Sequence, residues 1–173
     1  MRFKTLVNPP AVDGGILPGL CKAHPVDTKR ISGVLEIARD FDVILFSTED
    51  TLTKNGKTHP AGAVLVPSLR RMERKLAMFS ADPYLSREEV AKHVNYLGLS
   101  FAPERILLTE DFDNLKAKFP LAHKSRILMV CSDIITEVAL GQAQGLTTLL
   151  ITNEIDQNGS DFGIEPDYIA TSV

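Results

Sequence analysis

The sequence contains no tryptophan and only two cysteines, Cys21 and Cys131, in 173 residues. Two cysteines do not build a disulfide framework, and Cys131 ends an apolar run, which predicts a buried thiol in a reducing compartment. The net charge of -3 excludes a global basic field, so direct nucleic-acid binding is not indicated. No apolar stretch is long enough to cross a membrane, and no secretory apolar segment follows Met1.

The rest of the composition is that of an ordinary globular domain. Apolar residues make up 44% of the chain, enough for one domain with a substantial core. The histidines lack the spacing of zinc ligands; they are His24, His59, His93 and His123. One basic cluster, which we interpret as the solvated face of a helix rather than a binding patch, comprises Arg70, Arg71, Arg74 and Lys75.

Residues 1–26 differ from the rest because they are rich in proline, glycine and small residues, which exclude a long helix or a central strand. We predict an extended N-terminal arm over 1–26 and an α/β domain over 27–173. Leu6, Val7 and Leu17 are among the apolar residues that the arm can bury against a protein partner. The first twelve residues carry basic but no acidic side chains, which is compatible with a mitochondrial targeting remnant. The alternative location is the cytoplasm.

The remainder alternates between strand and helix patterns. Strands are predicted at 43–47, 75–80, 104–109, 126–131, 147–152 and 168–170. Helices are predicted at 28–39, 66–72, 86–97, 111–118 and 133–144, and a polar, turn-rich loop at 53–60. Such alternation with short connections is typical of a three-layer α/β/α, Rossmann-like domain with a mostly parallel sheet.

The strand at 43–47 ends abruptly at polar residues, as a buried parallel strand does where its carboxyl end opens into a loop. Ser47 and Thr48 come first, followed by the acids Glu49 and Asp50. In open α/β sheets, ligands bind at the carboxyl ends of the strands. We therefore place the candidate site here.

The segment 43–52 resembles the first signature of the haloacid dehalogenase superfamily of phosphatases, an apolar run followed by Asp, any residue, Asp, Gly, Thr or Val, and Leu. The resemblance places the nucleophilic aspartate of that family on Ser47, its general acid/base on Glu49 and its glycine on Asp50. A serine oxygen is far more basic than a carboxylate, and no histidine adjoins Ser47 in the sequence to activate it. The resemblance thus implies the fold with a degenerate site.

The other signatures resemble the p-nitrophenyl phosphatase and nucleotide-phosphatase branch. Ser80 takes the phosphate-binding Ser/Thr position, whereas Ser132 takes the position of a magnesium-binding aspartate. Asp133 is displaced by one residue and Glu137 takes the second acidic place. Lys124 is the nearest candidate for the family's lysine. Between 99 and 126 there is room for one strand and one short helix, but not for the large cap domain of that branch. In an alternative alignment, this stretch matches half of such a cap.

Three functions follow as hypotheses. The first is a catalytically inactive protein that serves as a structural or assembly subunit of a larger complex. The second is a binding module that holds a phosphorylated ligand at Ser80 and at helix N-termini. The third is a divergent phosphatase that uses Glu49 or Asp50. No cofactor is expected and Mg²⁺ is not expected to bind, since Glu49, Asp50 and Asp133 read as loop acids rather than as a cation site.

Overall fold

The computed structural model describes residues 27–153 and 163–173. The arm predicted over 1–26, and Cys21 within it, lie outside the described residues. Cys131 is buried and not in a disulfide, as predicted. No helix of the described ranges has the length and hydropathy that crossing a bilayer requires.

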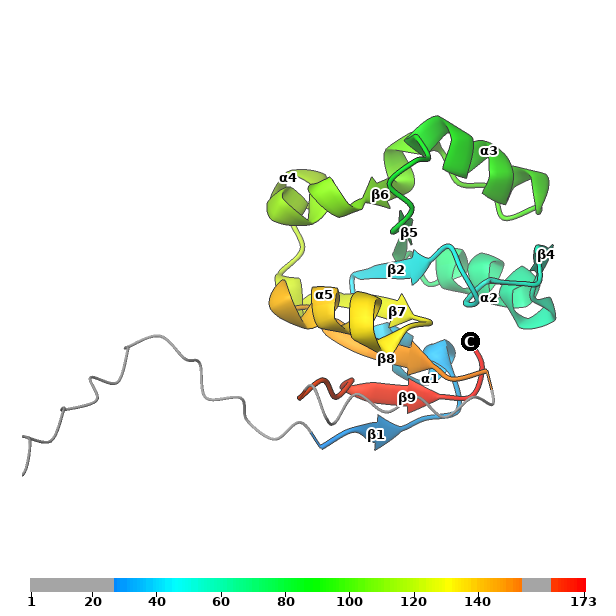
Figure 1. Cartoon of the computed structure of the whole chain (residues 1–173). Helices are drawn as coiled ribbons and strands as arrows, with labels where there is room; N and C mark the ends of the chain where they lie inside the picture. The colour runs from blue at the N-terminus through cyan, green and yellow to red at the C-terminus, as the bar shows by residue number, and fades with distance from the viewer. Residues whose placement is uncertain (1–26, 154–162) are drawn as a thin grey trace, which may run out of the picture.

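Seven parallel strands form one sheet in the order β1-β9-β8-β7-β2-β5-β6 (Figure 1). The strands are β1 (Lys29–Arg30), β2 (Val43–Ser47), β5 (Lys75–Ser80), β6 (Ile106–Leu108), β7 (Ile127–Cys131), β8 (Thr147–Ile151) and β9 (Tyr168–Ala170). Every residue of β2 and β7 is buried, because layers on both faces cover the sheet. The predicted parallel α/β fold is therefore confirmed.

The helices divide between the two faces of the sheet. Side chains of α1 (Val34–Ile37), α2 (Pro60–Arg71) and α3 (Arg87–Tyr96) share one apolar core with the sheet. Side chains of α4 (Leu115–Lys118) and the π turn η5 (Ile134–Val138), with α5 (Ala139–Ala143) packed beside them, form the second core. Short 3-10 turns complete the connections: η1 (Ala38–Asp40), η2 (Pro103–Arg105), η3 (Thr109–Asn114) and η4 (Lys124–Arg126).

The strand order reverses direction at β2. From β2 the chain proceeds outward to β5 and β6, whereas β7, β8 and β9 extend the sheet on the other side of β2. At such a switch point the flanking connections diverge to opposite faces and leave a crevice at the carboxyl edge. Ser47 ends β2 and Cys131 ends β7, so the predicted site lies at this crevice.

The prediction of a helix over 28–39 is wrong for the first half of this range. Lys29 and Arg30 form the edge strand β1, paired in parallel with Tyr168 and Ile169 of β9. The partner lies about 140 residues away along the chain, so local periodicity cannot reveal the pairing. The helix begins only after Gly33, where Glu36 Oε2 accepts hydrogen bonds from the backbone N (2.8 Å) and Oγ (2.7 Å) of Ser32.

The helix predicted to begin near Val66 begins instead at Pro60. His59 caps it, with Nδ1 accepting from the Ala61 backbone N at 3.2 Å, and Pro60 fits the first turn because its missing N–H is not needed there. Pro67 consequently lies inside the helix, on its exposed side. Burial of Leu65, Val66 and Leu69 against the sheet thus outweighs the intrinsic cost of an interior proline, about 3 kcal/mol.

Two further segments differ from the prediction. The loop at 53–60 contains the hairpin of β3 (Thr53–Lys54) and β4 (Lys57–Thr58), whose Asn55-Gly56 turn has φ of 51° and 67° as a tight hairpin requires. The helix predicted at 133–144 opens with the π turn η5, in which the Val138 N donates to the Asp133 O at 3.1 Å, and becomes regular only in α5.

Gly141 permits α5 to lie close against the sheet. A Cβ at this position would lie 2.7 Å from Thr148 Cγ2 and 3.1 Å from Met129 Sδ. The Thr148 methyl cannot rotate away, because its backbone N and Oγ1 both donate to Asp167 Oδ2, at 2.8 and 3.0 Å.

We therefore expect Gly141→Ala to lower the free energy of unfolding by about 1–3 kcal/mol, as overpacking does, despite the higher helix propensity of alanine. Urea unfolding followed by circular dichroism measures the change. Thr148→Ser keeps the hydroxyl and removes the methyl, so the double variant should recover most of the loss relative to Thr148→Ser alone. Stabilisation by Gly141→Ala would show that helix propensity dominates at this position.

Candidate functional site at the carboxyl edge of the sheet

Ser47 is the last residue of β2 and is 1% exposed. Its hydroxyl donates a short hydrogen bond to Glu137 Oε1. Its carbonyl accepts from Thr51 Oγ1 at 2.5 Å, which fixes the turn that follows the strand. Among the described residues, the Ser47 hydroxyl oxygen also accepts a hydrogen bond from the Glu49 backbone N, at 3.3 Å. Ser47 is therefore held as a donor to a carboxylate.

Glu137 lies in the π turn η5 and is 6% exposed. While Oε1 accepts from Ser47, Oε2 accepts from the Ser132 backbone N at 2.6 Å and from the Ser132 hydroxyl at 3.2 Å. Oε2 also accepts from the Asp133 backbone N at 3.3 Å. The Glu137 carboxylate thus joins the end of β2 to the loop after β7, across the crevice at the switch point.

Burial determines the electrostatics of this pair. Loss of solvation raises the pKa of Glu137 above its ordinary value, although the hydrogen bonds from Ser47 and from the Ser132 and Asp133 amides act in the opposite direction. The pKa of the Cys131 thiol is raised well above its ordinary range, first by burial and then by the charges of Glu137 and Asp133. Cys131 is therefore held as the thiol and is not a nucleophile.

The other acids predicted for the site do not converge on Ser47. Glu49 and Asp50 are exposed in the turn after β2, where Asp50 adopts a φ of 48° and its carbonyl accepts from Asn153 Nδ2 at 2.7 Å. Asp133 caps the helical segment, with Oδ1 accepting from the Thr136 N at 2.7 Å and from its hydroxyl at 2.6 Å. Each of these residues thus has a local structural contact or faces solvent.

Ser80 is the last residue of β5 and is buried at the carboxyl edge of the sheet, as Ser47 is. Its Oγ accepts from the Asp82 backbone N at 3.3 Å, as in a local turn. Ser80 lines a cavity of about 90 Å³ together with the acids Glu49, Asp82 and Glu137. His93 lines the same cavity, but three acidic side chains around so small a space disfavour a phosphate group.

The donor set does not fit the magnesium ion that the resemblance implies. Mg²⁺ requires an octahedral shell of oxygens that includes free carboxylates. Both oxygens of Glu137 already accept hydrogen bonds, and Asp133 is engaged with Thr136. Within 27–153 and 163–173, no cluster of three or more His, Cys, Asp or Glu side chains is suited to hold a metal ion.

Glu137 is the site residue that the sequence reasoning did not connect to Ser47. The sequence shows no base near Ser47, whereas the structure places a carboxylate against its hydroxyl. A signal was available, because Glu137 adjoins Val138 and follows Ile134 by three residues, on the buried side of the helical segment. An acid among buried apolar positions requires partners, but the pattern alone does not say which residues they are.

Comparisons with solved structures agree on the architecture. A 4-nitrophenylphosphatase from Thermotoga maritima matches 79% of this chain and 96% of its own, with a TM-score of 0.68 and 9% identity. A possible sugar phosphatase of the HAD superfamily from Cytophaga hutchinsonii matches 83% and 98%, with a TM-score of 0.69 and 12% identity. NagD from Escherichia coli K-12 matches 76% and 96%, with a TM-score of 0.63 and 9% identity.

The fold is that of the haloacid dehalogenase superfamily. Neither a family model nor a curated protein sequence matches the chain. The similarity to these solved structures confirms the fold that the signature resemblance implies. Within this haloacid dehalogenase-like fold, residues 106–108 form β6 of the main sheet, paired with β5. The described segment between β6 and β7 consists of η3, α4 and η4.

Proposed function

We propose that this chain is a catalytically inactive protein with a haloacid dehalogenase-like fold that serves as a structural or assembly subunit of a larger protein complex. The observation that carries the first part is the burial of Ser47 and the donation of its hydroxyl to Glu137. A nucleophile must reach its substrate, and Ser47 is not among the residues that line the adjacent cavity. The fold persists without catalysis because its packing depends on other residues.

The surface supports the second part. Leu35 of α1 is 48% exposed and Val64 of α2 is 66% exposed. Both line a hollow of about 340 Å³ between these helices, beside Val173. Apolar side chains gathered around a concavity are suited to contact another protein. The apolar residues in the sequence of 1–26 are further candidates for contacts with a partner. The basic, acid-free sequence of the first twelve residues supports a mitochondrial location, which cell fractionation tests.

The activity test uses p-nitrophenyl phosphate with millimolar Mg²⁺. We expect the wild-type rate to equal the buffer rate and to remain unchanged in Ser47→Ala, and we expect Mg²⁺ to leave the melting temperature unchanged. Turnover that depends on Mg²⁺ and vanishes in Ser47→Ala would overturn the proposal. It would support instead a divergent phosphatase that uses Ser47, with Glu137 as its hydrogen-bond acceptor, rather than Glu49 or Asp50.

The assembly test compares native complexes from cells that express the tagged wild type or Leu35→Asp/Val64→Asp. We expect the wild type to co-elute with partner subunits well above the mass of the monomer, and the variant to shift toward that mass. Both side chains are solvent-exposed, so the variant should unfold at the wild-type urea concentration. Elution of the wild type as a monomer would contradict the assembly role.

A further inference from the structure

A second hollow, of about 360 Å³, lies at the amino edge of the sheet, opposite the crevice at Ser47. Lys75 opens β5 and Arg105 immediately precedes β6, whereas Ser80 ends β5 at the other edge. The six residues of β5 separate the two edges by roughly 17 Å. The hollow is lined by Arg70, Arg74, Lys75, Leu76, Ser100, Phe101, Ala102 and Arg105.

Four of these eight lining residues are cationic and none is acidic. Among the described residues, none of the four cations forms a salt bridge with a carboxylate. The interpretation of this cluster as one solvated helix face is wrong, because α2 ends at Arg71 and the chain turns at Glu73, with a φ of 58°. Arg74 and Lys75 therefore join Arg70 from outside the helix, and Arg105 comes from the neighbouring strand connection.

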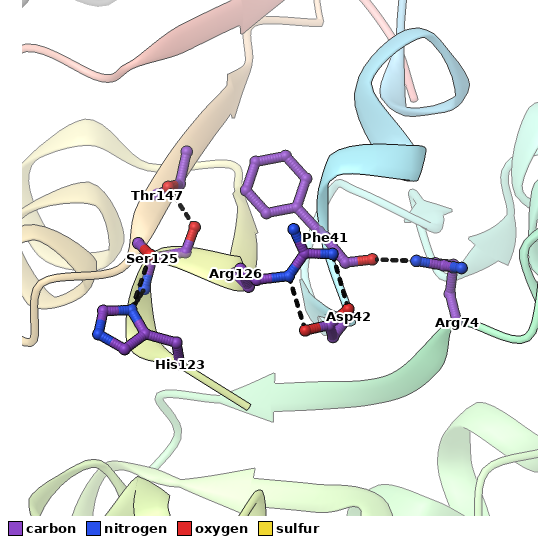
Figure 2. A network of polar contacts seen from close by, with 7 residues as sticks. All are labelled: Phe41, Asp42, Arg74, His123, Ser125, Arg126 and Thr147. Carbon is purple, nitrogen blue, oxygen red and sulfur yellow. Dashed lines mark hydrogen bonds and ion pairs between the residues drawn. The ribbon is translucent and has the colours of Figure 1, made fainter. Parts of the chain in front are cut away.

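Two of the guanidinium groups are fixed in place by neutral acceptors. Arg70 Nη2 donates to the Ser100 O at 2.5 Å, and its guanidinium lies 5.6 Å from the centre of the Phe101 ring. Arg74 donates to the Phe41 O and the Met72 O, each at 2.8 Å, and Figure 2 shows it directed toward Phe41. Carbonyl acceptors orient these side chains but carry no full negative charge that would neutralise the guanidinium groups.

Asp42, whose carboxylate feels the charges of Arg74 and Lys75, is already paired. Asp42 accepts two hydrogen bonds of 2.8 Å from Arg126, outside the hollow (Figure 2). These bonds hold the pKa of Asp42 below its ordinary value, with smaller contributions from the charges of Arg126, Arg74 and Lys75. Asp42 is therefore hydrogen-bonded to Arg126, and it acts on Arg74 and Lys75 only through the weaker attraction of a charge outside the hollow.

We propose that this hollow binds a small molecule that carries two or more linked phosphate groups. Arginine donates hydrogen bonds to phosphate oxygens, and the carbonyls that orient Arg70 and Arg74 use only part of their five N–H donors. Lys75 and Arg105 are exposed and free to close on further oxygens. The volume is within the range of small-molecule sites, and buried Leu76 and Phe101 form an apolar floor beneath the charges. The site is independent of Ser47 and of the proposed loss of catalysis.

Isothermal titration calorimetry with inorganic triphosphate tests the proposal on the full chain, which has no tryptophan to report binding. We expect saturable one-to-one binding at 50 mM NaCl that weakens at higher salt. Lys75→Gln and Arg105→Gln should each weaken binding about tenfold, since each removes one charge-assisted contact. Lys57→Gln, which removes an exposed charge from the hairpin at the other edge, should bind as the wild type does.

Three results would overturn the proposal. The first is no heat of binding at millimolar triphosphate. The second is an equal loss of affinity in Lys57→Gln and in the two hollow variants, because that pattern reports net charge and not a site. The third is binding of a single-stranded RNA oligonucleotide, sensitive to Lys75→Gln and Arg105→Gln, without binding of triphosphate. Unchanged urea midpoints in the variants ensure that affinity alone is compared.

Discussion

Replacing Ser47 with aspartate, the residue that the family resemblance places at this position, is expected to destabilise the protein by about 2–4 kcal/mol at pH 7. The new carboxylate would face Glu137 at hydrogen-bonding distance in a buried site. Two carboxylates in such contact cannot both ionise, so one must stay protonated. Holding an aspartic acid neutral at pH 7 costs up to about 4 kcal/mol, at about 1.36 kcal/mol for each pH unit above its ordinary pKa near 3.9.

The loss should depend on pH with a definite sign. In Ser47→Asp the folded-state pKa of the carboxyl pair is raised above its unfolded value. The folded state therefore retains a proton that the unfolded state releases, and stability falls as pH rises above about 4. Urea unfolding at pH 4, 5.5 and 7 measures this trend, which should appear as a widening gap between the variant and the wild type.

Ser47→Asn is the matched control, because it adds nearly the same volume without the charge and its amide can still donate to Glu137. The difference between the aspartate and asparagine variants isolates the electrostatic cost from overpacking. Equal stability of these two variants at neutral pH would show that the Glu137 carboxylate does not oppose a second negative charge, contrary to the geometry of the site.

The sequence predicted the sheet well because its strands are buried on both faces. The apolar runs at β2, β5 and β7 favour buried strands, and their alternation with helices along the chain predicts a parallel sheet. The failures occurred where distant partners decide the conformation. Lys29 and Arg30 become a strand only because β9 lies beside them, and α2 extends through Pro67 because its other face is buried.

The sequence placed Ser47 at the end of a strand, but it did not reveal the hydrogen-bond partner of this residue. The sequence indicated that position 47 lacks an attacking carboxylate, because aligning the apolar run 43–46 with the family signature is enough to place Ser47 there. The Glu137 contact could not be read from the sequence, since Ser47 and Glu137 are 90 residues apart and the π turn that presents Glu137 has no reliable sequence signal. Asp133 was interpreted as a loop acid rather than a cation ligand, and in the structure its carboxylate caps a helical segment.

Replacing Glu137 with alanine should be the most damaging single change at this edge, apart from a buried second charge. The truncation would leave the Ser47 hydroxyl and the Ser132 and Asp133 amides without their acceptor. An unsatisfied buried donor costs about 1–3 kcal/mol, and partial access of water at Ser132 reduces the sum, so we expect a loss of about 2–4 kcal/mol at pH 7. Urea unfolding measures it.

Glutamine at the same position separates the hydrogen bonds from the charge. Its carbonyl oxygen can accept from the Ser132 and Asp133 amides, and its NH₂ can donate to Ser47, whose hydroxyl then accepts. Because burial raises the folded-state pKa of Glu137, the contribution of this residue to wild-type stability is complete below the ordinary pKa of 4.5 and declines as pH rises through the raised value.

The stability of Glu137→Gln relative to the wild type should therefore increase from pH 4 to pH 8, while Glu137→Ala stays less stable than Glu137→Gln throughout. A wild type that gains stability over Glu137→Gln as pH rises would mean that the hydrogen bonds outweigh burial and that the pKa is lowered. Equal stability of the alanine and glutamine variants would mean that the hydrogen bonds of Glu137 to Ser47, Ser132 and Asp133 do not stabilise this edge of the sheet.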